Sequence, residues 1–352
     1  MKILITGKYE PDYNRTKIIL DGLHCNQNVT LLTFPYKNRL TLNYFKLRKL
    51  CKQADIIFIP AFCHQDVALL NMLTNKPIIF DPLISRYLSK VFDYKLVKTN
   101  SFRAKKNFYK DKISMSRADV VLCDTEAHKQ YYKTTFNLPE EKLKVVEVGV
   151  NTTEFKQVSK PATKTKSKFI VGFYGSFVPL QGIGKIIDAA FILKNKEDIE
   201  FWIIGSGFEY EKQYQYAIQQ LGLTNIHFSG WVPYDELEKN MSSFDVALGI
   251  FGDSLKASLV IPNKIYHYAA MGFPIITRDS TAIREVFSNH ENIMLTTNTP
   301  EAIADAIIKV KNNHQLAIKI GENAHRLIAG QYNHQVIANK VYKICNHLLA
   351  TK

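Results

Sequence analysis

Short apolar runs alternate with amphipathic segments along the first half of the chain. The runs are rich in Ile, Val, Leu and Phe, which is typical of buried strands. They occupy residues 1–6, 28–34, 55–62, 76–82, 118–124 and 144–149. Between several of them, apolar residues recur at helical spacing, as at 14–25, at 42–54 and from Thr125 onward. Strands that alternate with helices in this way predict repeated βαβ units and a parallel sheet.

The same alternation restarts in the second half. We expect strands at 169–175, 199–205, 226–230, 244–251 and 273–277, with helices at 184–195, 210–222 and 260–272. The predicted fold class is therefore α/β, with two Rossmann-like doubly wound domains that face each other across a cleft. Because such sheets bind ligands at the carboxyl ends of their strands, the shared cleft is the expected site.

A polar, lysine-rich stretch without periodicity separates the halves and is the best linker candidate. The final helical stretch, about 324–349, is long enough to brace both domains. We therefore expect an N-terminal Rossmann-like domain, a linker, a C-terminal Rossmann-like domain and a C-terminal helix. Their predicted bounds are 1–155, 156–167, 168–330 and 331–352.

Composition and charge narrow the class of protein. The 352 residues are 46% hydrophobic and 22% charged, as in globular proteins, and the formal net charge is +14. Such a charge favours an anionic partner, although an inert basic surface is the alternative. The five scattered cysteines, with no close pair, predict reduced and mostly buried thiols in a cytosolic protein. The opening MKILITG is too short for a signal peptide, and no apolar run reaches membrane-spanning length.

One lysine conflicts with its local structure. Pro262 suits the first turn of the helix at 260–272 and Gly272 suits its end. Lys264 then lies in the first helical turn, where the helix dipole is positive and disfavours a cation by a few tenths of a kcal/mol (roughly 0.3). A bound anion would resolve the conflict.

Other candidates follow strands, where a doubly wound sheet presents ligand contacts. Arg278, Arg284 and Glu285 follow the run PIIT, and a surface ion pair or helix cap explains Glu285 equally well. Asp81 ends a buried strand and His64 follows another, so either could deprotonate or orient a hydroxyl. The alternatives are an aspartate that caps a turn and an ordinary loop histidine.

The segment 85–117 combines charge with apolar side chains. It holds ten lysines and arginines against Asp93 and Asp111, with aromatic and aliphatic residues interleaved. This mixture suits a helix or loop that lies on anionic lipid headgroups. A solvated basic face packed on its own core is an equal alternative. Single-stranded nucleic acid could use the same residues, but no nucleic-acid motif accompanies them.

Several strands end in glycine, which lets a phosphate or sugar approach the backbone. Gly7, Gly175, Gly205 with Gly207, and Gly230 occupy such positions. The run IIGSG lacks the third glycine of a dinucleotide fingerprint, and no Walker A motif is present. Each junction alone is also explained by an ordinary strand-to-helix turn.

Taken in order, the runs of the second half resemble glycosyltransferases of the group 1, family 4 type. The runs that carry this resemblance are GFYGSFVPLQGIGKIIDAA, FWIIGSG, IHFSGWVPYDELEKNMSSFDVAL, PNKIYHYAAMGFPIIT and AIREVFSNHENIMLTTNTPEAIADAI. The first half matches only in its pattern. The resemblance implies a GT-B fold, a nucleotide-sugar donor on the C-terminal domain, an acceptor on the N-terminal domain, no metal or other cofactor, and retention of anomeric configuration.

The resemblance also implies roles for individual residues. Gly175 and Ser176 would face the donor diphosphate, with Gly205 and Gly207 nearby. Trp231 and Val232 would lie along the nucleotide base. The helix near Pro262, with Asn263 among its first residues, would aim its amides at the phosphates. Asp81 falls where many members carry a histidine or aspartate near the acceptor and the transferred sugar.

Departures from the family pattern qualify these roles. Two glutamates separated by seven residues are replaced by Leu259 and His267, of which His267 could still contact the ribose. The arginine and lysine of the first loop are replaced by Ser176 and Gln181, which leaves Lys264, Arg278 and Arg284 as sources of positive charge. The N-terminal glycine pair is reduced to Gly7, with Lys8 and Arg15 nearby as acceptor-side candidates.

The leading hypothesis is transfer of a hexose-type sugar from a UDP- or GDP-sugar to a saccharide acceptor, expected to be lipid-linked. This fits bacterial-type surface glycan assembly, such as lipopolysaccharide, on the cytoplasmic face of an anionic membrane, with no nucleic-acid partner. One alternative is a catalytically degenerate GT-B protein that acts as a binding or scaffold subunit. A less favoured one is a UDP-sugar epimerase.

Overall fold

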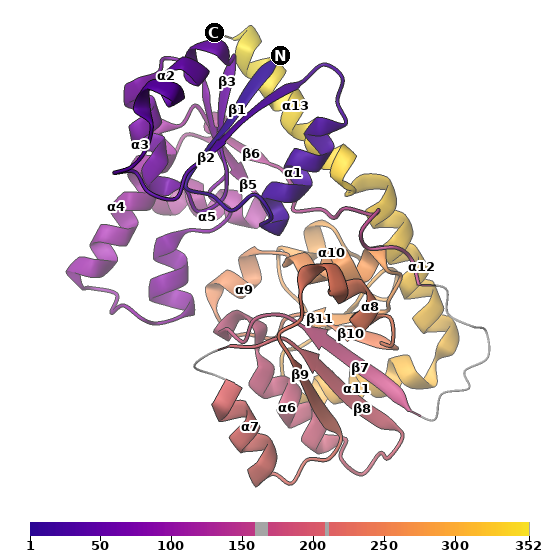
Figure 1. Ribbon diagram of the computed structural model, residues 1–352. Helices are drawn as coiled ribbons and strands as arrows, with labels where there is room; N and C mark the ends of the chain where they lie inside the picture. Colours follow the sequence, from indigo (N-terminus) through magenta and orange to yellow (C-terminus); the bar gives the residue numbers. More distant parts are fainter. Residues whose placement is uncertain (159–167, 208–210, 352) are drawn as a thin grey trace. The chain divides into compact units, whose positions relative to one another are not determined.

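The computed structural model describes residues 1–158, 168–207 and 211–351. These residues fall into two compact units (Figure 1): Met1–Gly149 together with Tyr332–Lys352, and Val150–Gln331. Each unit is built on a parallel sheet with helical crossovers, so the predicted Rossmann-like architecture of both halves is confirmed.

The first unit has a six-stranded sheet with the order β2-β1-β3-β4-β5-β6, and every neighbouring pair is parallel. Its strands are β1 (Lys2–Gly7), β2 (Thr30–Pro35), β3 (Ile56–Ile59), β4 (Ile78–Phe80), β5 (Val120–Cys123) and β6 (Leu143–Val145). Strands β3, β4 and β5 are buried along their whole length, which explains their uninterrupted apolar sequences.

The helices of the first unit connect these strands and close its C-terminal end. They are α1 (Asn14–His24), α2 (Tyr44–Gln53), α3 (His64–Leu73), a π-helical segment (Leu88–Asp93), α4 (Phe102–Arg117), α5 (Glu126–Phe136), a 3₁₀ turn (Glu140–Lys142) and α13 (His334–Ala350). Helix α13 packs along α1 (Figure 1), and a Cβ at Gly22 would lie only 2.2 Å from the carbonyl oxygen of His334. The close crossing of these two helices therefore requires glycine at position 22.

The second unit has a six-stranded parallel sheet with the order β12-β11-β10-β7-β8-β9. Its strands are β7 (Phe169–Tyr174), β8 (Ile199–Ile204), β9 (Ile226–Gly230), β10 (Val246–Leu248), β11 (Ile275–Arg278) and β12 (Met294–Thr296). Read from the β9 edge, this is the strand order of a dinucleotide-binding Rossmann sheet.

The helices of the second unit include two packed pairs, α6 with α11 and α10 with α12. The α-helices are α6 (Ile183–Ile192), α7 (Glu211–Gln220), α8 (Leu237–Met241), α9 (Leu255–Leu259), α10 (Asn263–Ala270), α11 (Pro300–Asn312) and α12 (His314–Gln331). Three 3₁₀ turns occupy Pro179–Gln181, Tyr234–Glu236 and Ile283–Glu285. The core between sheet and helices is built from buried side chains such as Phe173, Phe201 and Ile307.

The end of the chain differs from the expectation of one long helix over 324–349. Helix α12 ends at Gln331, and α13 begins at His334 after Asn333, whose side chain accepts a hydrogen bond from the amide of Val336 at 3.0 Å. Asparagine is a strong N-cap residue, so it starts a new helix where apolar spacing alone suggested continuity. The bracing of both domains by this stretch stays a prediction.

The boundary between the units also lies earlier than expected, at Gly149 rather than 155. The residues that follow are held by the second unit. The Phe155 ring stacks on the His267 ring at 3.9 Å, and the Val158 amide donates to the Met271 carbonyl at 3.1 Å. Most of the predicted linker, residues 159–167, lies outside the described residues.

Two further sequence predictions concern cysteines and membranes. The five cysteines are free thiols, and four of them are buried, as predicted. Within the described part of the chain, no helix combines the length and apolar character needed to cross a membrane.

Candidate functional site

The strand order of the second sheet changes direction between β7 and β10, and the loops after these strands meet at that point. The Phe251 amide donates to the Gln181 carbonyl at 3.0 Å, and the Gly252 amide donates to the Leu180 carbonyl at 3.1 Å. Doubly wound sheets bind their ligands at such a switch point. The candidate donor site therefore lies at the carboxyl end of β7.

Gly175 opens this loop and Lys264 reaches it from α10. Gly175 has φ +148°, a region that other residues rarely adopt, and a Cβ there would lie 2.8 Å from Nζ of Lys264. The same amine donates a hydrogen bond to Oε1 of Gln181 at 2.7 Å. A lysine from another part of the chain therefore reaches the loop in which this chain lacks the cations of the family pattern.

Lys264 is an unusually buried cation. Its side chain is 3% exposed, and Nζ lies 3.4 Å from the centre of the Phe173 ring. The amine makes no ion pair with any carboxylate in the described chain. Burial therefore lowers the pKa of Lys264 well below its ordinary value. The aromatic face offsets part of this cost, by about 2 kcal/mol for a desolvated cation.

His267 lies one turn further along α10 and is enclosed by aromatic rings. Its ring stacks on Phe155 at 3.9 Å, and Nδ1 lies 2.5 Å from the Tyr174 hydroxyl. Burial lowers the pKa of His267 to about 3, so the imidazole is neutral at pH 7. Nε2 is buried without a hydrogen-bond partner among the described residues. Since the residue is 1% exposed, a ribose would reach it only after the surrounding aromatic side chains moved.

The remaining predicted donor residues are spread around this loop. Gly205 follows β8 and lies beside Gly175, since a Cβ on it would lie 2.1 Å from the Gly175 carbonyl oxygen, and Gly207 packs against Phe177. Ser176 and Trp231 are exposed, and Trp231 is 72% accessible. Val232 is half-buried, and Asn263 is the first residue of α10, after Pro262 at the N-cap.

The predicted cations at the end of β11 and after it already have hydrogen-bond partners within the protein. The Arg278 guanidinium donates to the Gly252 carbonyl and so ties the ends of β11 and β10 together. Arg284 makes two hydrogen bonds of 2.6 Å to the carboxylate of Asp279 on the surface. Glu285 is exposed in the 3₁₀ turn that follows. Of the three predicted cations, Lys264 alone reaches the Gly175 loop in the contacts described here.

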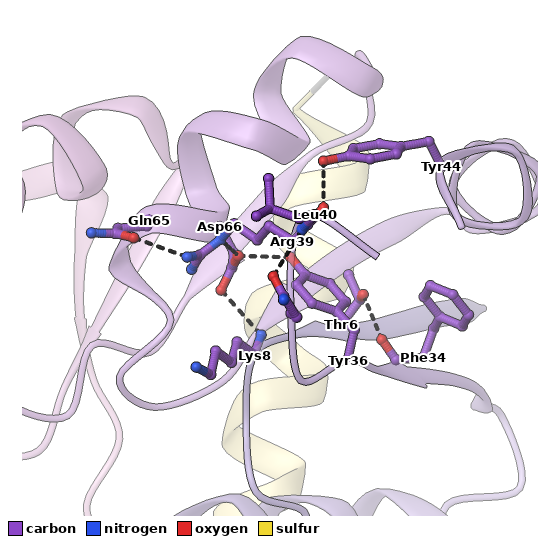
Figure 2. A network of polar contacts seen from close by, with 10 residues as sticks. Thr6, Lys8, Phe34, Tyr36, Arg39, Leu40, Tyr44, Gln65 and Asp66 are labelled. Atoms are coloured by element: carbon purple, nitrogen blue, oxygen red, sulfur yellow. Dashed lines mark hydrogen bonds and ion pairs between the residues drawn. The ribbon is translucent and has the colours of Figure 1, made fainter. Parts of the chain in front are cut away.

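The first sheet has its own switch point between β1 and β3, and Asp66 organises the loops there. Gly7 ends β1 with φ +137° and packs against Cys63. Figure 2 shows the buried Asp66 carboxylate accepting the Lys8 amide at 3.0 Å, the Tyr36 hydroxyl at 2.7 Å and Nε of Arg39 at 2.6 Å. This network fixes the ends of β1 and β2 around the first turn of α3, and the sequence analysis missed it.

Arg15 and Asp81 form a buried ion pair in the first unit. Nε of Arg15 lies 2.8 Å from Oδ2 of Asp81, and the two residues are 0% and 2% exposed. A second Arg15 nitrogen donates to the Glu147 carbonyl, and Oδ1 of Asp81 accepts the Leu83 amide at 3.2 Å. The two predicted residues are thus brought together, but each is committed to the other and to the backbone. This arrangement favours a structural role over proton transfer.

His64 and Asp111 form a second buried contact. Nε2 of His64 lies 3.5 Å from Oδ1 of Asp111, whose other oxygen accepts the Ser85 hydroxyl and the Tyr87 amide. Burial, and then the charge of Arg86, lowers the pKa of His64 to about 4. Burial raises the pKa of Asp111 to about 6. His64 is therefore a neutral, weakly basic imidazole at pH 7.

The basic segment 85–117 folds into the π-helical segment and α4. Its two acidic residues, Asp93 and Asp111, turn inward at 2% and 0% exposure, while large apolar side chains of α4 stay accessible. Phe102 is 80% exposed and Tyr109 is 57% exposed. The segment is thus a positively charged surface with apolar side chains on it.

Comparison with known proteins shows what the second unit is similar to. A family model described as glycosyl transferases group 1 matches residues 154–327. These residues, just under half of the chain, are thus similar to group 1 glycosyltransferases. The group 1 resemblance seen in the sequence is confirmed for the half that carries the Gly175 loop and Lys264, while the family 4 subtype stays a prediction.

The curated relatives that this chain resembles are also described as glycosyltransferases. An uncharacterised glycosyltransferase of Methanocaldococcus jannaschii, MJ1069, is 24% identical over 262 residues, which make up 71% of this chain and 65% of that protein. A second from the same organism, MJ1607, is 25% identical over 245 residues, or 65% of this chain and 61% of that protein. The chain thus matches somewhat less than two thirds of the length of these relatives.

Solved structures confirm the GT-B fold. Anabaena Alr3699/HepE in complex with UDP and glucose is 16% identical, with a TM-score of 0.77 over 99% of this chain and 100% of that chain. Sucrose-phosphate synthase from Thermosynechococcus elongatus is 15% identical, with a TM-score of 0.76 over 100% of both chains. The predicted assignment of this chain as a glycosyltransferase agrees with all these matches.

Proposed function

We propose that this protein transfers a hexose-type sugar from a UDP- or GDP-sugar to a saccharide acceptor. The observation that carries the proposal is Lys264, whose amine lies beside Gly175 in the loop after β7. A buried lysine without a carboxylate partner is costly, and a bound diphosphate would supply its counter-charge. The HepE structure, which holds UDP and glucose, supports this class of donor by analogy.

The proposed chemistry requires little more than positioning and charge. The bond between the anomeric carbon and the diphosphate oxygen breaks, and the diphosphate keeps the electron pair. The acceptor oxygen bonds to the anomeric carbon, and its proton passes to the departing diphosphate. Lys264 and the first amides of α10 would hold the leaving group as its negative charge grows. We propose that no metal is required and that the anomeric configuration is retained.

A thermal-shift screen of nucleoside diphosphates and their sugars tests the donor. A ligand at 100 times its Kd stabilises the folded protein by about 2.7 kcal/mol, which gives a clear shift in Tm. We expect UDP or GDP, with the corresponding sugar, to shift Tm in buffer containing EDTA. If no nucleoside diphosphate shifts Tm and no sugar transfer or donor hydrolysis follows, the proposal fails. NMR of the product anomer separates retention from inversion.

We propose further that the acceptor is lipid-linked and that the protein works at the cytoplasmic face of an anionic membrane, in surface glycan assembly. The support is the segment 85–117, with its cations outward and its carboxylates inward. Co-sedimentation with vesicles of anionic phospholipid should fall as salt rises, because exposed charges are screened. Vesicles that fail to bind at low salt would remove the membrane part of the proposal.

A degenerate binding subunit is the second candidate function. It is favoured by Leu259 and His267, which replace the two glutamates of the family pattern, and by the burial of His267 beneath Phe155. If Lys264→Met leaves the glycan profile of cells unchanged, this reading gains support. Loss of a glycan in that variant excludes it.

A further inference from the structure

A cavity of about 560 Å³ lies between α3 and α4 in the first unit. Ligand-binding cavities commonly have volumes of about 300–1,000 Å³. Its walls are almost wholly apolar, with Ala68 on α3 opposite Phe102, Tyr109 and Ile113 on α4. These three α4 side chains are 80%, 57% and 45% exposed. An open, apolar cavity of this size suits a flexible hydrocarbon chain.

Lysines surround the apolar lining. Lys105, Lys106 and Lys110 line the same cavity and form no ion pair in the described chain. The pKa of Lys110 is lowered by partial burial and then by the positive charges of Arg86, Lys106 and Lys90. The cavity mouth is therefore a site of concentrated, unneutralised positive charge, which complements a phosphate group.

The position of the cavity connects it to the ligand-binding edge of the first sheet. His64, the first residue of α3, lines the cavity and follows the end of β3 at the β1/β3 switch point. His64 also lines a smaller cavity of about 180 Å³ with Arg86 and Lys90. A molecule bound between α3 and α4 would present its head group beside this edge.

We infer that the cavity between α3 and α4 binds the hydrocarbon chain of a lipid phosphate. The chain lies against Ala68, Tyr109 and Ile113, and the phosphate is bound by the lysines of α4. The inference deepens the proposed function, on which it rests, by naming the acceptor as a lipid phosphate held in the first unit. It differs from general attraction to a bilayer, because a single lipid molecule should bind in the absence of a membrane.

Calorimetry with alkyl phosphates, below the concentrations at which they form micelles, tests the inference directly. The probes are inorganic phosphate and hexyl, octyl and decyl phosphate. If the chain enters the cavity, each two added methylenes should tighten binding by about 15-fold, while inorganic phosphate binds weakly or not at all. Affinity independent of chain length would overturn the inference, and so would binding of inorganic phosphate as tight as that of decyl phosphate.

Variants locate the binding site. Ala68→Phe should fill the cavity and weaken decyl phosphate at least tenfold, and Ile113→Asp, at an exposed position, should do the same if Ala68→Phe fails to fold. Lys106→Gln/Lys110→Gln should weaken binding at low salt without changing the dependence on chain length. The matched control, Lys49→Gln/Lys52→Gln on exposed positions of α2, should bind as wild type. Unchanged binding by the cavity variants contradicts the inference. UDP or GDP binding in the same samples reports separately on the donor site.

Discussion

The amine of Lys264 lies 2.7 Å from the amide oxygen of Gln181, the residue at the position where related proteins carry the loop lysine. The two residues are 83 positions apart in sequence, on α10 and in the loop after β7. The Lys264 amine, carried by α10, thus reaches the loop after β7, where this chain lacks the lysine of the family pattern. The conflict with the helix dipole at Lys264 is explained if a diphosphate binds at this point.

Donor binding should depend on pH through Lys264. Burial lowers its pKa in the free protein, and a bound diphosphate favours the charged form, so binding raises the pKa. Between the free and bound pKa values, binding takes up a proton and affinity falls as pH rises. Calorimetry in buffers of different ionisation enthalpy measures this uptake, which Lys264→Met should abolish. Proton release, or uptake unchanged in that variant, contradicts the assignment.

Asp81 should contribute mainly to stability. Removing one partner of a buried ion pair leaves the other charge uncompensated, at a cost of about 3–5 kcal/mol. Asp81→Asn should therefore lower the free energy of unfolding in urea by about 3 kcal/mol, and Arg15→Met/Asp81→Leu should recover part of the loss. Asp12→Asn, at an exposed position in the same unit, is the control. A stable Asp81→Asn protein without transferase activity would instead support a catalytic role.

The titrations of His64 and Asp111 should change the free energy of unfolding in opposite directions as pH rises. The pKa of His64 falls from 6.5 to about 4 on folding, so the unfolded chain binds more protons between these values and stability rises with pH. The pKa of Asp111 rises from 3.8 to about 6, so the folded chain binds more protons there and stability falls with pH. The two effects largely cancel between pH 4 and 6.

A variant that removes one of the two groups should show the pH dependence of stability that the other group contributes. In His64→Phe, stability should fall as pH rises from 4 to 6. In Asp111→Asn it should rise over the same interval, each with a slope of up to about 1.4 kcal/mol per pH unit. Urea titrations at several pH values measure these slopes. Equal slopes in the two variants would show that the buried pair does not titrate in this way.

The two side-chain donors to Asp66, Tyr36 and Arg39, should differ in their contribution to stability. Hydrogen bonds to a charged group contribute about 1.5–3 kcal/mol, more where both partners are buried. Tyr36→Phe removes a bond from a buried hydroxyl, whereas Arg39 is one-third exposed and should contribute less than about 1 kcal/mol. Asp66→Ala should cost more than either. The order Asp66, Tyr36, Arg39 in urea unfolding is the test, and a larger effect at Arg39 than at Tyr36 would contradict it.

The strands could be predicted because each is formed by a short run of consecutive apolar residues. Runs such as DIIFIPAF and KPIIFDP are apolar on both faces, as a covered parallel sheet requires, and they became β3 and β4. The break between α12 and α13 was missed because apolar spacing continues through it, and only the capping side chain of Asn333 marks the new helix.

The site could be predicted only in part, because its contacts join distant positions. Asp66 meets Lys8, Tyr36 and Arg39 across 58, 30 and 27 residues, and none of the four stands out in its own segment. Arg15 and Asp81, 66 residues apart, were both selected, but their pairing and burial were not. The aspartate in the first turn of the helix after β3 was the one available signal for the Asp66 network.

Binding of nucleoside diphosphate by wild-type protein and by Lys264→Met tests the central claim most directly. Calorimetry should show that UDP or GDP binds more tightly than the monophosphate or the nucleoside. Lys264→Met should weaken the diphosphate by about 10- to 100-fold, because a charge-assisted hydrogen bond is lost, while the exposed control Lys239→Met binds as wild type. Equal binding by folded Lys264→Met and wild type, or no diphosphate binding by either, would contradict the account.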